Sequence, residues 1–195
     1  LPDGAIVIGM VGNIRAWKGQ ETLVRAIAEV VGEHPNVRCF LVGDTSPSDR
    51  TYEAKLRQLI QALKLEGHIV FTGFQRHVTN YLTMFDVMVH ASVSPEPFGR
   101  VVLEAMACRK PFIGSRAGAI PELVEEGVTG LTFPPGDAPA LAQAIRRVLA
   151  DKDEEWAFAA AYQAMVRMAR ALILAEGFRA KGGRSRDSQK TVVTA

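Results

Sequence analysis

The chain has 195 residues, of which 48% are hydrophobic and 23% are charged, and its formal net charge is +2. A chain of this length and apolar content buries one substantial core, so we expect a single domain rather than two. The nearly balanced charge indicates neither a nucleic-acid partner nor a disordered acidic segment.

The first half of the chain alternates between predicted strands and helices. AIVIGMVG, from Ala5, is a β-branched run typical of a strand that is buried on both faces of a parallel sheet. GQETLVRAIAEVVGEH follows it with apolar residues at helical spacing. The strands NVRCFLVG and HIVFTG then stand on either side of a polar DTSPSD loop and the helix YEAKLRQLIQALKL.

The alternation continues in the second half of the chain. After a short helix around NYLTMF come a strand, DVMVHA, a helix in SPEPFGRVVLEAMA, a strand, PFIGS, and a short helix from Pro121. The strand GLTFPP precedes the helix DAPALAQAIRRVLA, which Asp137 is expected to cap, and a further helix is predicted over residues 153–175.

Strands that alternate with helices predict right-handed crossovers and an α/β fold. We expect a doubly wound parallel sheet of the Rossmann type, with helices on both faces. We assign residues 1–176 to this domain and residues 177–195, which are basic, polar and Gly-rich, to a disordered tail.

The cysteines and histidines lack the spacing of a metal site. Cys39 and Cys108 lie far apart in apolar runs, which predicts free thiols in a reducing compartment. No pair of histidines has metal spacing, so we expect no metal site. His90, at the end of a predicted strand, is interpreted as a satisfied structural histidine, with a ligand contact as the alternative.

No charged-then-apolar leader opens the chain, and no apolar run reaches the roughly 18 residues that span a bilayer. We therefore expect a soluble, cytoplasmic protein that associates with a membrane only through parts absent from this sequence.

Ligands of doubly wound sheets bind beyond the carboxyl ends of the strands, where the strand order reverses. The informative loops are therefore GNIRAWKG, GFQRH, SVSPEPFG and SRAGAIPE, because each follows a strand. The first loop places Arg15 and Lys18 before a helix, where its amides bind phosphate. It matches neither the P-loop nor GxGxxG, and a solvated basic turn with Trp17 as a hydrophobic staple is the alternative.

SVSPEPFGRVVLEAMA carries Glu96 ahead of a Pro-Phe-Gly turn and Glu104 inside an apolar run. The turn opens a helix, so amides near Gly99, Arg100 and Val101 lack intrahelical acceptors and can bind an anion.

Glu104, one helical turn after Arg100, is predicted to accept hydrogen bonds from a ribose diol. Its apolar neighbours leave almost no polar face, which favours a buried or half-buried carboxylate with a ligand over a solvent-exposed one. Glu96 is predicted to accept hydrogen bonds from sugar hydroxyls, and complementing the helix dipole is the alternative.

These motifs, in this order and spacing, resemble the carboxyl-terminal, donor-binding half of the retaining GT-B glycosyltransferases of family 4, also called group 1. The resemblance runs from about Ile6 to Leu149 and includes VGNIRAWKGQ, FLVGD, VFTGF, SPEPFGRVVLEAMA and AGAIPELVEEGVTGLTFPPGD. It implies a hexosyltransferase-type enzyme, with no required metal, that moves a sugar from a nucleotide diphosphate sugar to an acceptor with retention of configuration. The sugar nucleotide is a substrate, and no cofactor is implied.

The resemblance also implies roles for individual residues. Lys18 would bind the donor diphosphate, Glu96 the sugar and Glu104 the ribose, while the loop at Gly73 and Phe74 would flank the base. Arg15, Lys18 and Glu96 would be the catalytic residues. The other residues expected to contact the donor are Gly12, Asn13, Phe98, Gly99, Arg100 and Val101.

This sequence departs from the family pattern at three places. Asn13 stands where many members have Arg, and Arg15 is expected to supply that charge. Arg109 stands where the family usually has Gly, which should cost strain if that site is left-handed. The segment from Arg167 onward does not resemble the usual closing helix.

A GT-B enzyme also needs an amino-terminal acceptor-binding domain, and this sequence does not contain one. The alternatives are therefore a non-catalytic nucleotide-binding module of the Rossmann type, a truncated or degenerate transferase half, and a GT-B epimerase of nucleotide sugars.

Overall fold

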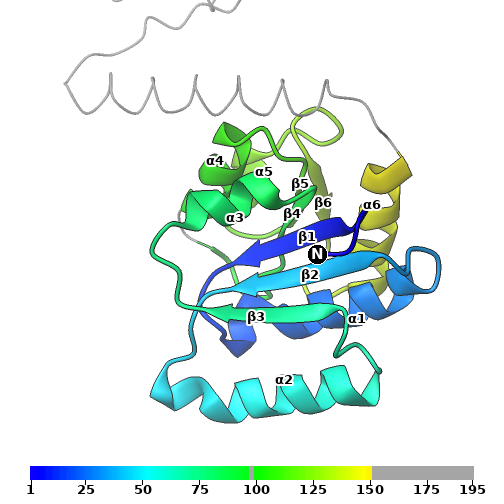
Figure 1. Ribbon diagram of the computed structural model, residues 1–195. Helices are drawn as coiled ribbons and strands as arrows, with labels where there is room; N and C mark the ends of the chain where they lie inside the picture. Colours follow the sequence, from blue (N-terminus) through cyan, green and yellow to red (C-terminus); the bar gives the residue numbers. More distant parts are fainter. Residues whose placement is uncertain (97–98, 151–195) are drawn as a thin grey trace, which may run out of the picture.

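The computed structural model describes residues 1–96 and 99–150, which form one parallel sheet covered by helices on both faces (Figure 1). The strands are β1 (Ile6–Val11), β2 (Val37–Val42), β3 (Ile69–Gly73), β4 (Val87–His90), β5 (Phe112–Ser115) and β6 (Leu131–Phe133). The α-helices are α1 (Gln20–Val31), α2 (Arg50–Ala62), α3 (Val78–Met84), α4 (Arg100–Ala107), α5 (Ile120–Leu123) and α6 (Ala138–Ala150). Two short 3-10 helices are η1 (Ala16–Lys18) and η2 (Pro47–Asp49).

The strand order is β3-β2-β1-β4-β5-β6, and every neighbouring pair is parallel. This order confirms the predicted doubly wound sheet, and it reverses direction between β1 and β4. The predicted strands and helices before residue 151 are confirmed, although the DTSPSD loop also contains η2. The helix predicted over 153–175, the domain limit at residue 176 and the basic tail lie outside the described residues.

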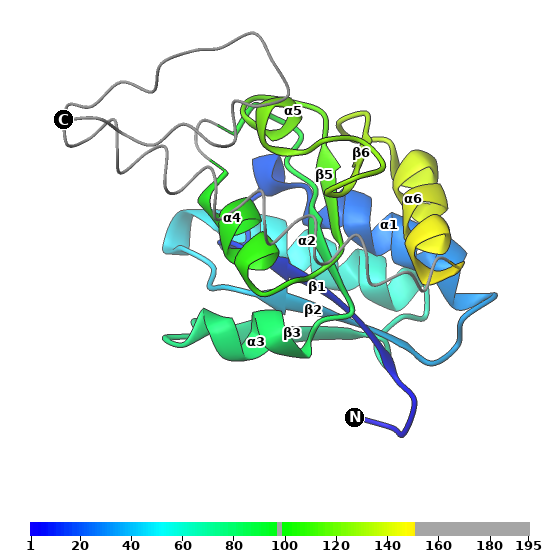
Figure 2. The same cartoon turned by 90° about the horizontal axis from the view of Figure 1, so that it is seen from above.

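Two apolar layers hold the helices on the sheet. The layer with α1, α2 and α6 includes Ile8 and Met10 of β1, whereas Val7 joins the layer with α3, α4 and α5, as the alternation of side chains in a strand requires. In both views α6 lies beside α1 (Figures 1 and 2). Because both faces are covered, the carboxyl edge is where loops with polar side chains gather.

Neither cysteine forms a disulfide, as the sequence predicted. Burial raises the pKa of the Cys39 thiol to about 12, so this group stays protonated and behaves as a small apolar side chain. No helix in the described part of the chain is long and apolar enough to cross a membrane.

The ends of the helices show both favourable and strained backbone. The Ala140 amide donates to Asp137 Oδ1 at 2.9 Å, which confirms the predicted cap of α6. At the other end of α4, the Arg109 amide donates to Met106 O and the Lys110 amide to Ala105 O, the pair of bonds of a Schellman motif. This motif holds Arg109 at a φ of 56°, so the site is left-handed. The strain expected for a non-glycine residue at this position therefore applies.

We expect Arg109→Gly to raise the free energy of unfolding by about 0.5–1 kcal/mol, because glycine removes the left-handed penalty but gains entropy in the unfolded chain. Arg109→Ala is the matched control, since it removes the charge and keeps Cβ. Lys64, with a φ of 57° after α2, should respond to glycine in the same way. Urea denaturation measures these differences, and equal stability of the Gly and Ala variants at residue 109 would contradict the strain.

Candidate functional site

An ion pair joins the loops that follow β1 and β4, where the strand order reverses. Lys18 Nζ lies 2.6 Å from Glu96 Oε2, and each side chain is only 17% exposed. The two residues are 78 positions apart in the sequence and reach each other from loops that lead to helices on opposite faces of the sheet. The structure therefore brings together two of the predicted site residues at the predicted place.

The backbone around Lys18 is fixed by the strand next to it. Gly19 ends η1 and begins α1 with a φ of 78°, and a Cβ at this position would lie 1.9 Å from Ala91 O. The Val93 amide donates to Trp17 O at 2.8 Å and ties the same two loops together. Lys18 Nζ also lies 4.2 Å from the centre of the Trp17 ring, within the range of a cation–π contact.

The backbone of Glu96 is held by the loop that follows β5. The Ala119 amide donates to Glu96 O at 2.9 Å, and Gly118, at a φ of 59°, packs directly on the Glu96 peptide. A Cβ at Gly118 would lie 2.5 Å from Glu96 N and 2.4 Å from Glu96 O. Only glycine therefore permits both this backbone conformation and this approach.

Glu96 is ionised at neutral pH. Burial alone would raise the pKa of its carboxyl, but the hydrogen bond and charge of Lys18, with a smaller contribution from His90, outweigh burial and lower it. Its Oε1 atom accepts no hydrogen bond from any residue that the structure describes, whereas Oε2 takes the Lys18 ammonium.

His90 is the third member of this cluster. It is 2% exposed, and its Nε2 lies 3.5 Å from Glu96 Oε2 and 3.2 Å from Ser92 Oγ. Burial and the charge of Lys18 lower the pKa of His90 more than Glu96 raises it, so the imidazole is neutral at neutral pH. The sequence led us to expect a structural histidine with its hydrogen bonds satisfied. His90 is buried, but its Nδ1 has no hydrogen-bond partner among the described residues, so that part of the expectation is wrong.

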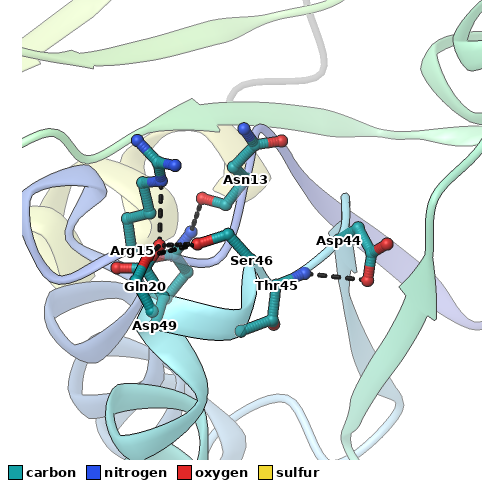
Figure 3. A network of polar contacts seen from close by, with 8 residues as sticks. Asn13, Arg15, Gln20, Asp44, Thr45, Ser46 and Asp49 are labelled. Atoms are coloured by element: carbon teal, nitrogen blue, oxygen red, sulfur yellow. Dashed lines mark hydrogen bonds and ion pairs between the residues drawn. The ribbon is translucent and has the colours of Figure 1, made fainter.

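Arg15 lies beside η2. Its Nε is 3.0 Å from Asp49 Oδ2, but the N–H direction does not fit a hydrogen bond, so the contact is an ion pair (Figure 3). Asp49 also accepts a hydrogen bond from Ser46 Oγ. No hydrogen bond or ion pair of the described chain joins Arg15 to Lys18 or Glu96, and its catalytic role stays a prediction.

Asn13 is exposed, and its main chain anchors the first loop. Its carbonyl accepts a hydrogen bond of 2.9 Å from the side chain of Gln20, which is 1% exposed (Figure 3). Gly12 lies under the Lys18 stem, because a Cβ at Gly12 would be 3.8 Å from Lys18 Cδ and Cε. Both residues therefore shape the loop that carries the cation.

Glu104 is exposed, so the expectation of a buried or half-buried carboxylate is wrong. The side of α4 that packs on the sheet consists of Val102, Ala105 and Met106, and the apolar neighbours of Glu104 do not enclose it. A ribose contact of Glu104 stays a prediction, now with a carboxylate that solvent and ligand can both reach.

The other predicted contact residues surround the same edge. Gly99 is the N-cap of α4 at a φ of 56°, Arg100 is exposed and Val101 is half-buried. Phe74, directly after β3, is 75% exposed. Phe98 lies outside the described residues. Within the described chain, no group of three or more His, Cys, Asp and Glu side chains has an arrangement that could hold a metal ion.

The family of group 1 glycosyl transferases matches residues 1–165 of the chain. The chain belongs to this family. A curated relative, the N-acetyl-alpha-D-glucosaminyl L-malate synthase of Bacillus anthracis, is 39% identical over 145 residues, which cover 74% of this chain and 36% of that protein. This member of the family therefore spans less than two fifths of the relative's length.

Solved structures show which half of the GT-B fold the chain matches. The Anabaena protein HepE, in complex with UDP and glucose, superposes with a TM-score of 0.83 at 35% identity, over 89% of this chain and 48% of that one. The C-terminal domain of a group 1 protein, LpcC of Francisella tularensis, gives a TM-score of 0.78 at 25% identity, over 84% of this chain and 86% of that one. This family member has the fold of the carboxyl-terminal half of a GT-B glycosyltransferase.

Two features of the site were missed in the sequence. The role of Gly118 could have been suspected, because it is the glycine of the SRAGAIPE loop, which was already expected at the carboxyl edge. The contact between His90 and Glu96 had a weaker signal: alternation places His90 on the same face as Met88, the face that α4 covers.

We expect Gly118→Ala to lower the free energy of unfolding by about 1–3 kcal/mol more than Gly127→Ala, because only the first methyl group collides with the Glu96 peptide. Gly127 is the matched control, since its φ is 75° and a Cβ there would meet only the Arg147 side chain, at 3.8 Å. Urea denaturation of both variants gives the difference. Equal losses would mean that backbone strain alone, and not the approach to Glu96, requires glycine.

Proposed function

We propose that this chain is the donor-binding domain of a glycosyltransferase that moves a hexose from a nucleotide diphosphate sugar to an acceptor with retention of configuration and without a metal. The observation that carries the proposal is the Lys18–Glu96 pair at the switch point of the sheet. Full activity would require an amino-terminal acceptor-binding domain, as the 48% coverage of HepE suggests.

In this proposal Lys18 binds the diphosphate of the donor. Its ammonium has three N–H groups, and the hydrogen bond to Glu96 uses one, which leaves two for phosphate oxygens. The first turn of α4 adds amides, because Gly99 caps the helix without a side-chain hydrogen bond. Fixed positive groups of this kind stabilise the charge that develops on a departing diphosphate, which is what a metal ion does in other enzymes.

Glu96 holds the donor sugar. Its ionised carboxylate keeps Oε2 on Lys18, so that Oε1 can accept a hydrogen bond from a sugar hydroxyl. Glu104 lies further along the chain, inside α4, and offers an exposed carboxylate for the ribose diol. Phe74 offers an exposed aromatic face for the base.

The solved relatives support a uridine nucleotide as the first donor to test. HepE was crystallised with UDP, with UDP and glucose, and with UDP-glucose, at 34–35% identity to this chain. Within the proposed site, Glu96, Lys18, Glu104 and Phe74 offer groups for the sugar, the diphosphate, the ribose and the base of such a molecule.

One observation favours a second candidate, a nucleotide-binding module without transferase activity. Asp49 neutralises Arg15, the residue expected to replace the missing arginine at Asn13. If that cation does not reach the diphosphate, binding can persist while the leaving group is poorly stabilised.

We expect calorimetric titration with UDP, GDP, ADP and UDP-glucose to detect binding of at least one ligand by this chain. Glu104→Ala should weaken nucleotide binding by roughly 1–3 kcal/mol, because hydrogen bonds to a charged group are lost. Glu96→Ala should weaken binding of the sugar nucleotide more than that of the nucleotide alone. Glu66→Ala, an exposed carboxylate before β3, is the matched control. Absence of binding at millimolar nucleotide would refute the donor site.

The transferase proposal has its own test. A protein that joins this chain to its amino-terminal acceptor domain should transfer sugar equally well in excess EDTA and in added Mg²⁺, because Lys18 and the α4 amides carry the charge stabilisation. NMR of the product should show the anomeric configuration of the donor. Nucleotide binding without transfer would favour the non-catalytic module, and an acceptor-independent change of the sugar would favour an epimerase.

A further inference from the structure

His90 is the most unusual polar group in the described part of the molecule. Its side chain is 3% exposed, and its Nδ1 has no hydrogen-bond partner among the described residues. A buried imidazole that only filled space would gain nothing over an apolar side chain and would lose the hydration of both nitrogens. The contacts of Nε2 therefore have to account for its presence.

These contacts favour one tautomer of the ring over the other. Glu96 Oε2 lies 3.5 Å from Nε2, and Ser92 Oγ lies 3.2 Å from the same atom. With the proton on Nδ1, the Nε2 lone pair would face the Glu96 carboxylate, and only the Ser92 hydroxyl could donate to it. With the proton on Nε2, the N–H lies near two oxygens that can accept it, so the geometry favours the Nε2–H form.

The surroundings also determine the charge of the ring. The charged groups that face it are Lys18, from the loop after β1, and Glu96, from the loop after β4. Burial and the Lys18 ammonium both disfavour an imidazolium, and a second cation would compete with Lys18 for Oε2. The ring is therefore a neutral donor.

We propose that His90 is a positioning residue, whose Nε2–H and Lys18 together hold Glu96 Oε2 and thereby orient Oε1 toward the donor sugar. The orientation of Glu96 is a property of this chain alone, whereas its effect on the sugar rests on the proposed function. His90 does not touch the substrate in this scheme.

A hydrolase-type relay does not fit the same residues. In such a relay the imidazole contacts the carboxylate through one nitrogen and the serine through the other. Here Ser92 and Glu96 both face Nε2, and Ser92 Oγ is buried. Ser92 is instead a structural neighbour, since its carbonyl accepts a 2.6 Å hydrogen bond from Ser115.

The first experiment needs no ligand. In the ¹⁵N-labelled chain, the imidazole signals that are missing in His90→Gln belong to His90, and they should report the Nε2–H tautomer. Glu96→Gln should lower the pKa of His90 further, because an attractive negative charge is lost, and Lys18→Met should raise it, because a repulsive positive charge is lost. His68, at the amino end of β3, provides the reference signal. An Nδ1–H tautomer, or a pKa of His90 that moves in neither variant, would overturn the proposal.

The second experiment measures the consequence for the sugar. His90→Leu removes the donor, whereas His90→Gln keeps an amide N–H close to the position of Nε2. We expect His90→Leu to weaken UDP-glucose binding about tenfold while UDP binding changes less than about twofold, and His90→Gln to recover most of the loss. Equal losses in the two variants, or equal losses for the two ligands, would reduce His90 to a packing residue.

The two experiments separate the two proposals. If the parent chain binds neither ligand, the donor-binding function fails, and the tautomer and the opposite pKa shifts still decide whether His90 holds Glu96.

Discussion

The ion pair of Lys18 and Glu96 is the interaction on which the site depends, because it joins the two halves of the sheet where their winding reverses. Both groups are mostly removed from water, which is favourable only if the geometry is good and the remaining polar atoms find partners. The fold provides that geometry through the main chain. Gly19 lets the Lys18 loop touch β4, and Gly118 lets the loop after β5 touch the Glu96 peptide.

This arrangement restrains the backbone of Glu96 through contacts from neighbouring loops. Loops after three strands meet at one carboxylate, so moving any of them displaces Glu96. Positions held by close backbone packing lose little freedom on binding, which is the usual source of affinity in preorganised sites. The charges of the cluster are also balanced, since one cation faces one carboxylate and the adjacent His90 stays neutral.

Departures from the family pattern have physical consequences that are now visible. Arg109 occupies a left-handed position that glycine would fill without strain. Arg15 pairs with Asp49, so the cation expected to compensate for Asn13 belongs to a separate network (Figure 3). Neither departure touches the Lys18–Glu96 pair, which explains how the central geometry tolerates both.

The sequence alone determined the order of strands and helices, the parallel sheet and the loops that reach its carboxyl edge, because apolar periodicity is local and the topology rules need only the order of the elements. It also placed Lys18 and Glu96 in neighbouring loops. Only the tertiary structure decided that Glu104 is exposed, that Arg15 turns to Asp49 and that His90 contacts Glu96. Periodicity says which residues share a face, but the direction of a long side chain depends on partners that are distant in the sequence, here 34 positions away for Arg15 and 78 for Lys18.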